Sequence, residues 1–305
     1  PGHDYQLAID LLSKVRHDLD PLYWPAPLAE AEILIDKDNR AEATEALLEA
    51  LSLNPVCSQA WYKLGLLAVD RYDFERAAYA AEKLRAINLT HPLADLLEAR
   101  CRLQQRDVAG ARAVIEPAVT RFPAHRQFLA LLAATEALAF DDAALQSTLN
   151  RFDQLAPAGS ANPLAHHTVG AVLAAARQYD AGEAMLREAI GRQPNWPAPW
   201  IELGLLLIQA GRDEDAHHAL AQAARLDPFN RRANNQLKLV EELLSYQQIE
   251  TEHFLIRFKS GIDEALARDM PDQLEQIYRE ITTAFEHCPA RKTHIDIMPD
   301  ERYFG

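Results

Sequence analysis

Residues 198–228 read APWIELGLLLIQAGRDEDAHHALAQAARLDP, and the order of large and small apolar residues in this stretch decides the fold. The stretch combines a Trp, a Leu-Gly pair, two alanines and a closing proline, at Trp200, Leu203, Gly204, Ala216, Ala223 and Pro228. The same spacing recurs in AWYKLGLLAVDRYDFERAAYAAEKL, at Trp61, Leu64, Gly65 and Ala77. A pattern that returns at a fixed period predicts a repeat architecture.

Further copies of the pattern keep the small residues and the closing proline. They are Ala31, Ala43, Ala50 and Pro55; Ala99, Ala111, Ala118 and Pro123; Ala133, Leu145, Phe152 and Pro157; and Gly170, Gly182, Ala189 and Pro194. The period is 34 residues from Pro123 to Pro157 and from Pro194 to Pro228, and the step between these pairs is longer because of the loop AGSAN. We therefore predict six repeats, at 24–55, 58–89, 92–123, 126–157, 163–194 and 197–228.

The residue types explain how such a unit would pack. Small residues such as Gly204 and Ala216 let two helix axes approach closely, while Trp61 and Trp200 fill the space between successive hairpins. A closing proline stops a helix because it lacks an N–H group and disfavours helical geometry before it. A 34-residue period with this pattern resembles the tetratricopeptide repeat, a helix-turn-helix unit. The resemblance implies an all-α solenoid, wound as a right-handed superhelix, over residues 24–228.

The segments on either side of the repeats follow other patterns. Residues 1–23 predict a helix that covers the first repeat, and residues 229–249 predict a capping helix, because a terminal repeat would otherwise expose an apolar face. In TEHFLIRF, residues 251–258, polar and apolar residues alternate, which predicts a strand. A helix is expected at 263–286, with its apolar stripe interrupted at Pro271, and a second strand at 292–300. Residues 250–305 thus predict a small, incomplete β-α-β segment.

Composition and charge exclude several classes of function. The 305 residues carry a formal charge of -14 with a pI near 5.2, so a nucleic-acid backbone or an anionic membrane surface would repel the chain. No run of about 18 apolar residues predicts a membrane span. The chain begins at Pro1 without a charged and then apolar leader, so we expect a soluble protein, in the bacterial cytoplasm or exported after removal of a signal.

Few residues suggest chemistry. The three cysteines are far apart, and the adjacent pairs His166-His167 and His217-His218 point about 100° apart on a helix, so neither pair can chelate one ion. The charged stretch GRDEDAHH, 211–218, is expected to be a solvated turn between two helices. We find no phosphate-binding loop and no nucleophile with a paired base. The sequence therefore predicts no catalytic residues, no metal ligands, no cofactor and no enzyme activity.

The remaining function is a scaffold that binds a protein or a peptide segment, from another protein, from the same protein or from a neighbouring copy. In tetratricopeptide repeat proteins the first helix of each hairpin lines the concave face, and the register here predicts an apolar groove. Its residues are Tyr62, Leu66, Val69, Leu96, Arg100, Leu103, Ala130, Ala134, Ala137, His167, Ala171, Ala174, Ile201, Leu205 and Ile208. Arg100 and His167 would be polar contacts that fix the register of the ligand. In the alternative interpretation, several of these side chains pack against the second helices.

The C-terminal segment suggests a second function. Thr251, His253, Phe254, Ile256 and Phe258, followed by a helix and by Ile295, Ile297 and Pro299, resemble the opening of peptidase MA-like metallopeptidases, a gluzincin group. In bacteria such domains are often fused to tetratricopeptide repeats. The resemblance implies a zinc enzyme whose repeats recruit substrate, but the His-Glu-x-x-His helix that binds zinc is absent from this sequence. The alternative function is thus the N-terminal part of a metallopeptidase whose active site lies beyond this chain.

Overall fold

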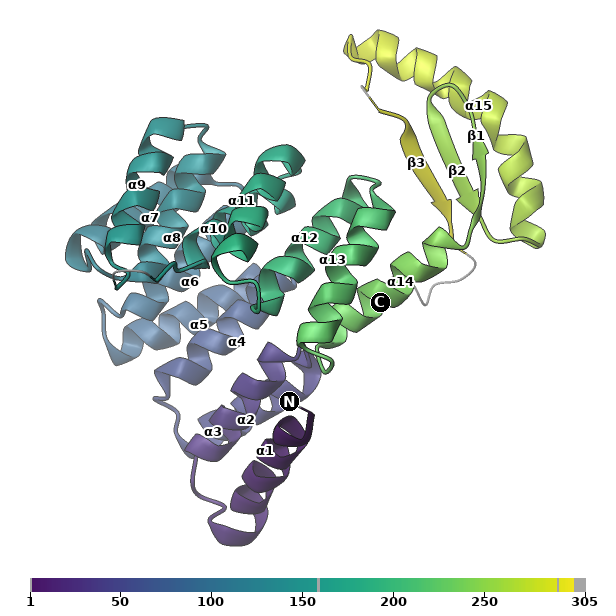
Figure 1. Ribbon diagram of the computed structural model, residues 1–305. Helices are drawn as coiled ribbons and strands as arrows, with labels where there is room; N and C mark the ends of the chain where they lie inside the picture. Colours follow the sequence, from purple (N-terminus) through teal and green to yellow (C-terminus); the bar gives the residue numbers. More distant parts are fainter. Residues whose placement is uncertain (1, 158–159, 290, 299–305) are drawn as a thin grey trace.

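The computed structural model describes residues 2–157, 160–289 and 291–298 and contains the six predicted helical hairpins (Figure 1). They are α2 (Pro25–Asp36) with α3 (Arg40–Leu53), α4 (Ser58–Asp70) with α5 (Phe74–Ile87), α6 (Pro92–Gln104) with α7 (Val108–Arg121), α8 (Arg126–Leu138) with α9 (Asp142–Gln154), α10 (Leu164–Ala175) with α11 (Tyr179–Arg192), and α12 (Pro197–Gln209) with α13 (Asp213–Leu226). Helix α1 (Gly2–Lys14) and a π-helical turn (Val15–Leu19) precede them, and α14 (Arg231–Leu244) follows. The helical solenoid is confirmed.

The turn inside each hairpin has the same backbone geometry. One residue per turn has a positive φ, at Asp38, Tyr72, Arg106, Phe140, Arg177 and Gly211. Only the last of these is a glycine, so five side chains accept a left-handed conformation that costs roughly 1–2 kcal/mol. In three turns the following aspartate offsets part of this cost, because Asp73, Asp107 and Asp141 accept hydrogen bonds from backbone N–H groups in the first turn of the second helix.

Close helix packing holds the hairpins together. A Cβ atom added at Gly204 would lie 2.5 Å from Cγ of Leu220, and one added at Gly170 would lie 2.7 Å from Cγ of Leu186. Both leucines are fully buried. The prediction that Gly204 lies at the closest approach of paired helices agrees with this packing.

The fifth hairpin stacks differently from the others. Apart from its hairpin partner α11, helix α10 packs mainly against α8, the first helix of the preceding hairpin, and makes little contact with α9. Helix α8 is apolar on nearly all sides and buried from Phe128 to Leu131 and from Ala133 to Leu138, which is typical of a helix covered all round. Arg106, in the turn between α6 and α7, donates from Nη2 to the carbonyl of Ala175, the last residue of α10, at 3.1 Å. The longer connection before α10 therefore accompanies a sharp change in stacking.

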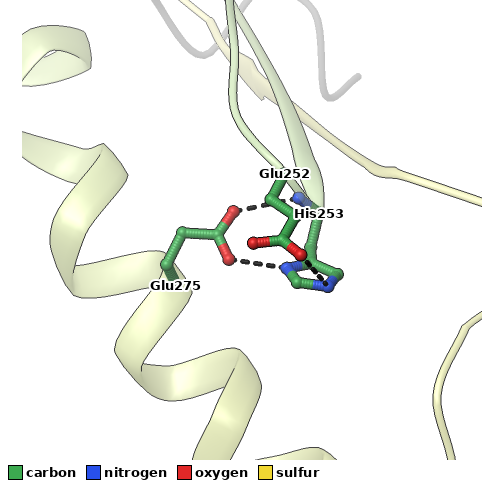
Figure 2. Close-up of side chains that lie close together, drawn as sticks. All are labelled: Glu252, His253 and Glu275. Carbon is green, nitrogen blue, oxygen red and sulfur yellow. Dashed lines mark hydrogen bonds and ion pairs between the residues drawn. The ribbon is translucent and has the colours of Figure 1, made fainter.

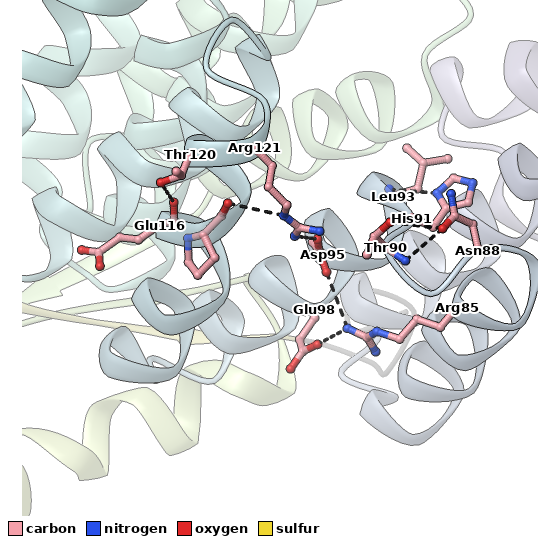
Figure 3. A network of polar contacts seen from close by, with 11 residues as sticks. Arg85, Asn88, Thr90, His91, Leu93, Asp95, Glu98, Glu116, Thr120 and Arg121 are labelled. Carbon is pink, nitrogen blue, oxygen red and sulfur yellow. Dashed lines mark hydrogen bonds and ion pairs between the residues drawn. The ribbon is translucent and has the colours of Figure 1, made fainter.

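Ion pairs join neighbouring repeats on the surface. Asp95, at the start of α6, accepts from Arg121 of the same hairpin at 2.5 Å and lies 3.8 Å from Arg85 of the preceding hairpin (Figure 3). Arg85 also contacts Glu98. These side chains are partly exposed, so each pair contributes little on its own, and the network mainly orients the α5–α6 junction.

The two ends of the repeat array touch. Lys37 Nζ donates to Asp227 at 2.8 Å, and Asn230 Nδ2 donates to the Asp36 carbonyl at 3.0 Å. The Arg231 backbone N–H donates to the Lys37 carbonyl at 2.9 Å. In Figure 1 the purple hairpin α2–α3 accordingly lies beside the green end of α13 and α14. The superhelix is thus closed within a single turn, which the sequence did not predict.

The C-terminal segment forms a three-stranded sheet covered on one side by a helix. Its strands are β1 (Gln247–Glu250), β2 (Phe254–Phe258) and β3 (Thr293–Ile297), in the order β1-β2-β3, and its helix is α15 (Ile262–Phe285). Strand β2 is antiparallel to β1 and parallel to β3. Phe254, Ile256 and Phe258 are buried against α15.

One expectation for this part of the chain needs correction. The predicted capping helix ends at Leu244, because Gln247–Glu250 pairs with β2 as a strand. The helix predicted at 263–286 is present as α15, which runs continuously from Ile262 to Phe285 and includes Pro271. Pro299 and residues 301–305 lie outside the described residues.

A buried ion pair attaches the sheet to the last repeat. Arg257 of β2 contacts Asp213 of α13 and donates to Asp296 of β3 at 2.5 and 2.8 Å. The side chains of Arg257 and Asp213 are only 9% and 6% exposed. The expectation that residues 211–218 form a solvated turn is therefore wrong at Asp213, because the sheet covers it. No local sequence pattern indicates this contact, since the two residues lie 44 positions apart.

Glycine substitutions test the helix packing. Gly204→Ala should destabilise the chain by about 1–3 kcal/mol, because the new methyl group overlaps the buried Leu220. Hydrogen exchange should then speed up first in residues 197–228. The matched control is Gly191→Ala in α11, where a Cβ meets no atom within 4 Å, and it should stabilise the chain by about 0.5–1 kcal/mol. Equal effects of the two substitutions would contradict the packing.

Charge reversal tests the closure. Asp227→Lys places two ammonium groups together at the Lys37 contact, so the ends of the array should separate. Small-angle scattering should show a larger radius of gyration, while circular dichroism shows unchanged helicity. Glu188→Lys, the same charge change on the exposed face of α11, serves as the control. An unchanged radius in the Asp227 variant would show that these contacts do not hold the superhelix closed.

Candidate functional site

The structure divides the predicted groove residues into two groups. Of the fifteen predicted groove residues, nine are buried, among them Tyr62, Val69, Leu96, Ala134 and Ile201. The other six are partly exposed: Leu66, Arg100, His167, Ala171, Leu205 and Ile208. Leu103, Ala130, Ala137 and Ala174 are also buried. The expectation of one continuous apolar groove open to water is therefore wrong.

The burial follows from how tightly the superhelix is wound. The first helices α4, α6, α8, α10 and α12 contact one another in succession, and α6 also reaches α10. We call the side of the superhelix that these five first helices line the inner surface. Ala134 lies fully buried on α8, against which α10 packs, and Leu96 on α6 is equally buried. A wider superhelix would have exposed them. The alternative interpretation expected several predicted groove side chains to be packed against the second helices; these residues are indeed buried, but the packing that covers Ala134 involves another first helix.

Charged residues from five helices converge near the remaining exposed positions. Arg232 of α14 donates to Glu202 of α12 at 2.7 Å. Arg40 of α3 lies 3.5 Å from Asp70 of α4. Burial raises the pKa of Asp70, and the charges of Arg40, Arg100 and Arg232 act against that rise. Residues distant in sequence thus share one electrostatic environment, because the closed superhelix returns α12 and α14 to the first repeats. The sequence analysis did not predict this cluster of charged residues.

Two polar atoms at the inner surface lack hydrogen-bond partners. Arg100 Nε and His167 Nε2 are buried and have no hydrogen-bond partner among the described residues. The His167 ring lies 4.7 Å from the Trp196 ring, centroid to centroid. Burial lowers the pKa of His167, the positive charges of Arg100 and Arg232 lower it further, and Glu202 opposes them. The imidazole is therefore neutral at physiological pH.

A separate polar cluster lies in the C-terminal segment and was also missed. Glu275 of α15 accepts a hydrogen bond from the Thr251 hydroxyl at 2.5 Å. It also accepts one from the His253 backbone N–H at 2.9 Å, and its second oxygen lies 2.7 Å from His253 Nδ1 (Figure 2). These bonds, with Thr251 first, lower the pKa of Glu275 to about 2. Glu252 completes the group. The partners are more than 20 positions apart, so no local pattern could have revealed them.

Comparison with known proteins supports the repeat assignment. The family model described as "Tetratricopeptide repeat" matches residues 28–88 and 170–231. Among solved structures, the hetero-tetramer Cut9-Hcn1 of APC/C aligns with a TM-score of 0.50 at 15% identity, over 76% of this chain and 45% of that chain. A tetratricopeptide repeat protein from Parabacteroides merdae aligns at 0.49 and 13% identity, over 79% and 93%. The search of curated proteins gave no match.

The chain therefore carries tetratricopeptide repeats arranged as a helical solenoid. It spans less than half the length of Cut9-Hcn1, and a likeness of this size shows the fold alone. Repeats of this family are generally non-enzymatic scaffolds for protein or peptide binding. The comparisons give no support for the peptidase MA-like resemblance of residues 250–305, which stays a prediction. Within the described residues, no helix is both long and apolar enough to cross a membrane.

Buried histidines predict a loss of stability in mild acid. The pKa values of His125, His166 and His167 all lie below the ordinary 6.5, and burial is the first cause for each. The unfolded chain then binds more protons as the pH falls below about 6.5, so the free energy of unfolding decreases. Urea titrations between about pH 7.5 and pH 5.5 should show this decrease, and His167→Gln should make it smaller. A pH-independent stability over this range would contradict the burial of neutral imidazoles.

Proposed function

We propose that the chain is a scaffold that binds a protein or peptide segment on its inner surface. The observation that carries this proposal is the pair of buried atoms without partners, Arg100 Nε and His167 Nε2, beside partly exposed apolar residues of the same surface. An unsatisfied buried donor costs roughly 1–3 kcal/mol, so a ligand toward whose acceptor the Arg100 side chain turns on binding would remove a penalty present in the free chain.

The inner surface also indicates the character of the ligand. Leu66, Leu205 and Ile208 offer apolar contacts, while Arg100 Nε donates a hydrogen bond and neutral His167 can accept or donate one. A segment with apolar side chains around a carbonyl or carboxylate group suits this combination. Arg232 and Arg40 are already paired with Glu202 and Asp70. Binding should consequently depend on burial more than on long-range charge, and hence only weakly on salt.

Paired substitutions test this assignment. A peptide library would be screened against the full chain. Isothermal titration calorimetry would then compare the affinity of the selected peptides for the unmodified chain and for the double variant Leu66→Asp/Leu205→Asp. Each new carboxylate opposes burial of the ligand, so binding should be lost while helicity is retained. The control is Leu48→Asp/Leu89→Asp, because these leucines are 54% and 86% exposed outside the inner surface. This variant should bind as the unmodified chain does.

Two outcomes would contradict the proposal. Binding retained by the Leu66/Leu205 variant but lost by the Leu48/Leu89 variant would assign the ligand to the outer helices. Binding abolished by moderate salt would instead indicate recognition through the charged turns, since exposed charges are screened within about 10 Å at 0.1 M salt. An Arg100→Met variant adds detail: it removes the donor while keeping the apolar stem, and should weaken binding of acceptor-containing peptides selectively.

A further inference from the structure

The polar cluster at the β2–α15 junction has the composition of a metal site. One imidazole and two carboxylates, from His253, Glu252 and Glu275, each offer a ligand atom, and the three atoms lie within 4.8 Å of one another. Figure 2 shows the Glu252 carboxylate beside the gap between Glu275 and the His253 ring. Imidazole and carboxylate together are ligands that zinc and related divalent ions accept.

Outer contacts hold two of the three side chains in place. One oxygen of Glu275 accepts from the Thr251 hydroxyl and the His253 backbone N–H, which leaves the other oxygen directed at His253. The His253 ring stacks on Tyr278, with 3.7 Å between ring centroids. Such outer contacts orient the ligands of known metal sites and strengthen binding. Glu252 is different, because its side chain is 83% exposed and can reorient.

We propose that Glu252, His253 and Glu275 bind one divalent transition-metal ion of the zinc class. The ion would lie between His253 Nδ1 and the facing oxygen of Glu275, with Glu252 as the third ligand and water as the fourth. Nδ1 would bind the ion through its lone pair, which leaves the ring proton on Nε2. This site departs from the sequence-based expectation of no metal ligands.

The distances are compatible with modest adjustment. Tetrahedral ligands at about 2.1 Å from zinc lie roughly 3.4 Å from one another. His253 Nδ1 and Glu275 Oε2 are 2.7 Å apart, and the closest contact between Glu252 and the ring, to Nε2, is 3.8 Å. The pair formed with Glu275 must therefore widen by several tenths of an ångström, while the exposed Glu252 rotates inward.

Charge also favours a cation at this position. Two carboxylates flank a single ring, and the neighbouring Lys292 is already bonded to Glu250 and to the Thr251 carbonyl. The competing account is a structural hydrogen bond between His253 and Glu275, with Glu252 solvated and unrelated. The two accounts differ in what Glu252 does, because only a metal site needs it.

The experiment uses the full chain without an affinity tag. Zinc would be titrated calorimetrically into the unmodified chain, Glu252→Gln and Asp269→Asn, and cobalt would be added to follow the visible absorption of a four-coordinate ion. Glu252→Gln removes one ligand and leaves the His253–Glu275 bond intact, so the variant should fold normally. Asp269→Asn removes the same charge from an exposed position of α15 outside the cluster.

We expect the unmodified chain to bind one zinc ion. The zinc affinity of Glu252→Gln should be lower by a factor of roughly ten or more, the scale of loss seen when a supporting group is removed. Asp269→Asn should bind as the unmodified chain does, and bound zinc should raise the melting temperature. The proposal is overturned if the unmodified chain shows no saturable binding near stoichiometric zinc. It is equally overturned if Glu252→Gln binds zinc and produces the cobalt spectrum as strongly as the unmodified chain.

Discussion

Close approach between helices is the constraint on which the structure depends. Gly170 and Gly204 stand where a leucine of the paired helix, Leu186 or Leu220, fills the space that a Cβ would need. Gly65 makes the equivalent approach between hairpins, against Leu97 of the next repeat. Because each repeat contacts mainly its neighbours, small changes in this spacing accumulate along the array. Tight packing at these points, together with the altered stacking of α10 on α8, brings the last helices back to the first hairpin.

Closure of the superhelix then determines what the inner surface contains. One ion pair and three hydrogen bonds join residues 36–39 to residues 227–231. The first helices pack on one another and bury apolar residues such as Leu96 and Ala134. What stays partly exposed is a smaller set around Arg100 and His167, close to charges supplied by α12 and α14. The candidate binding surface is therefore mixed in character, with apolar and hydrogen-bonding positions side by side.

The sequence predicted the hairpins well because their signals are local and periodic. Gly204, Ala216 and Pro228 mark helix contacts and a helix end within one 34-residue unit. The groove could not be predicted to the same degree, since whether Tyr62 or Leu205 is exposed depends on the pitch of the whole superhelix. Strand β1 was assigned to the capping helix because Gln247–Glu250 has no alternating pattern of its own and becomes a strand by pairing with β2. The Arg257–Asp213 contact and the Glu252–His253–Glu275 cluster join distant positions, which no single-sequence periodicity records.

The most direct test of the account is a hydrogen-exchange footprint of a library-selected peptide bound to the full chain. If the inner surface is the binding surface, amide protection should rise in α4, α6 and α12, around Leu66, Arg100 and Leu205. The outer helices α3, α5 and α13 should exchange as they do in the free chain. Protection confined to those outer helices, or to α15 and the sheet, would contradict the assignment of the inner surface as the site of binding.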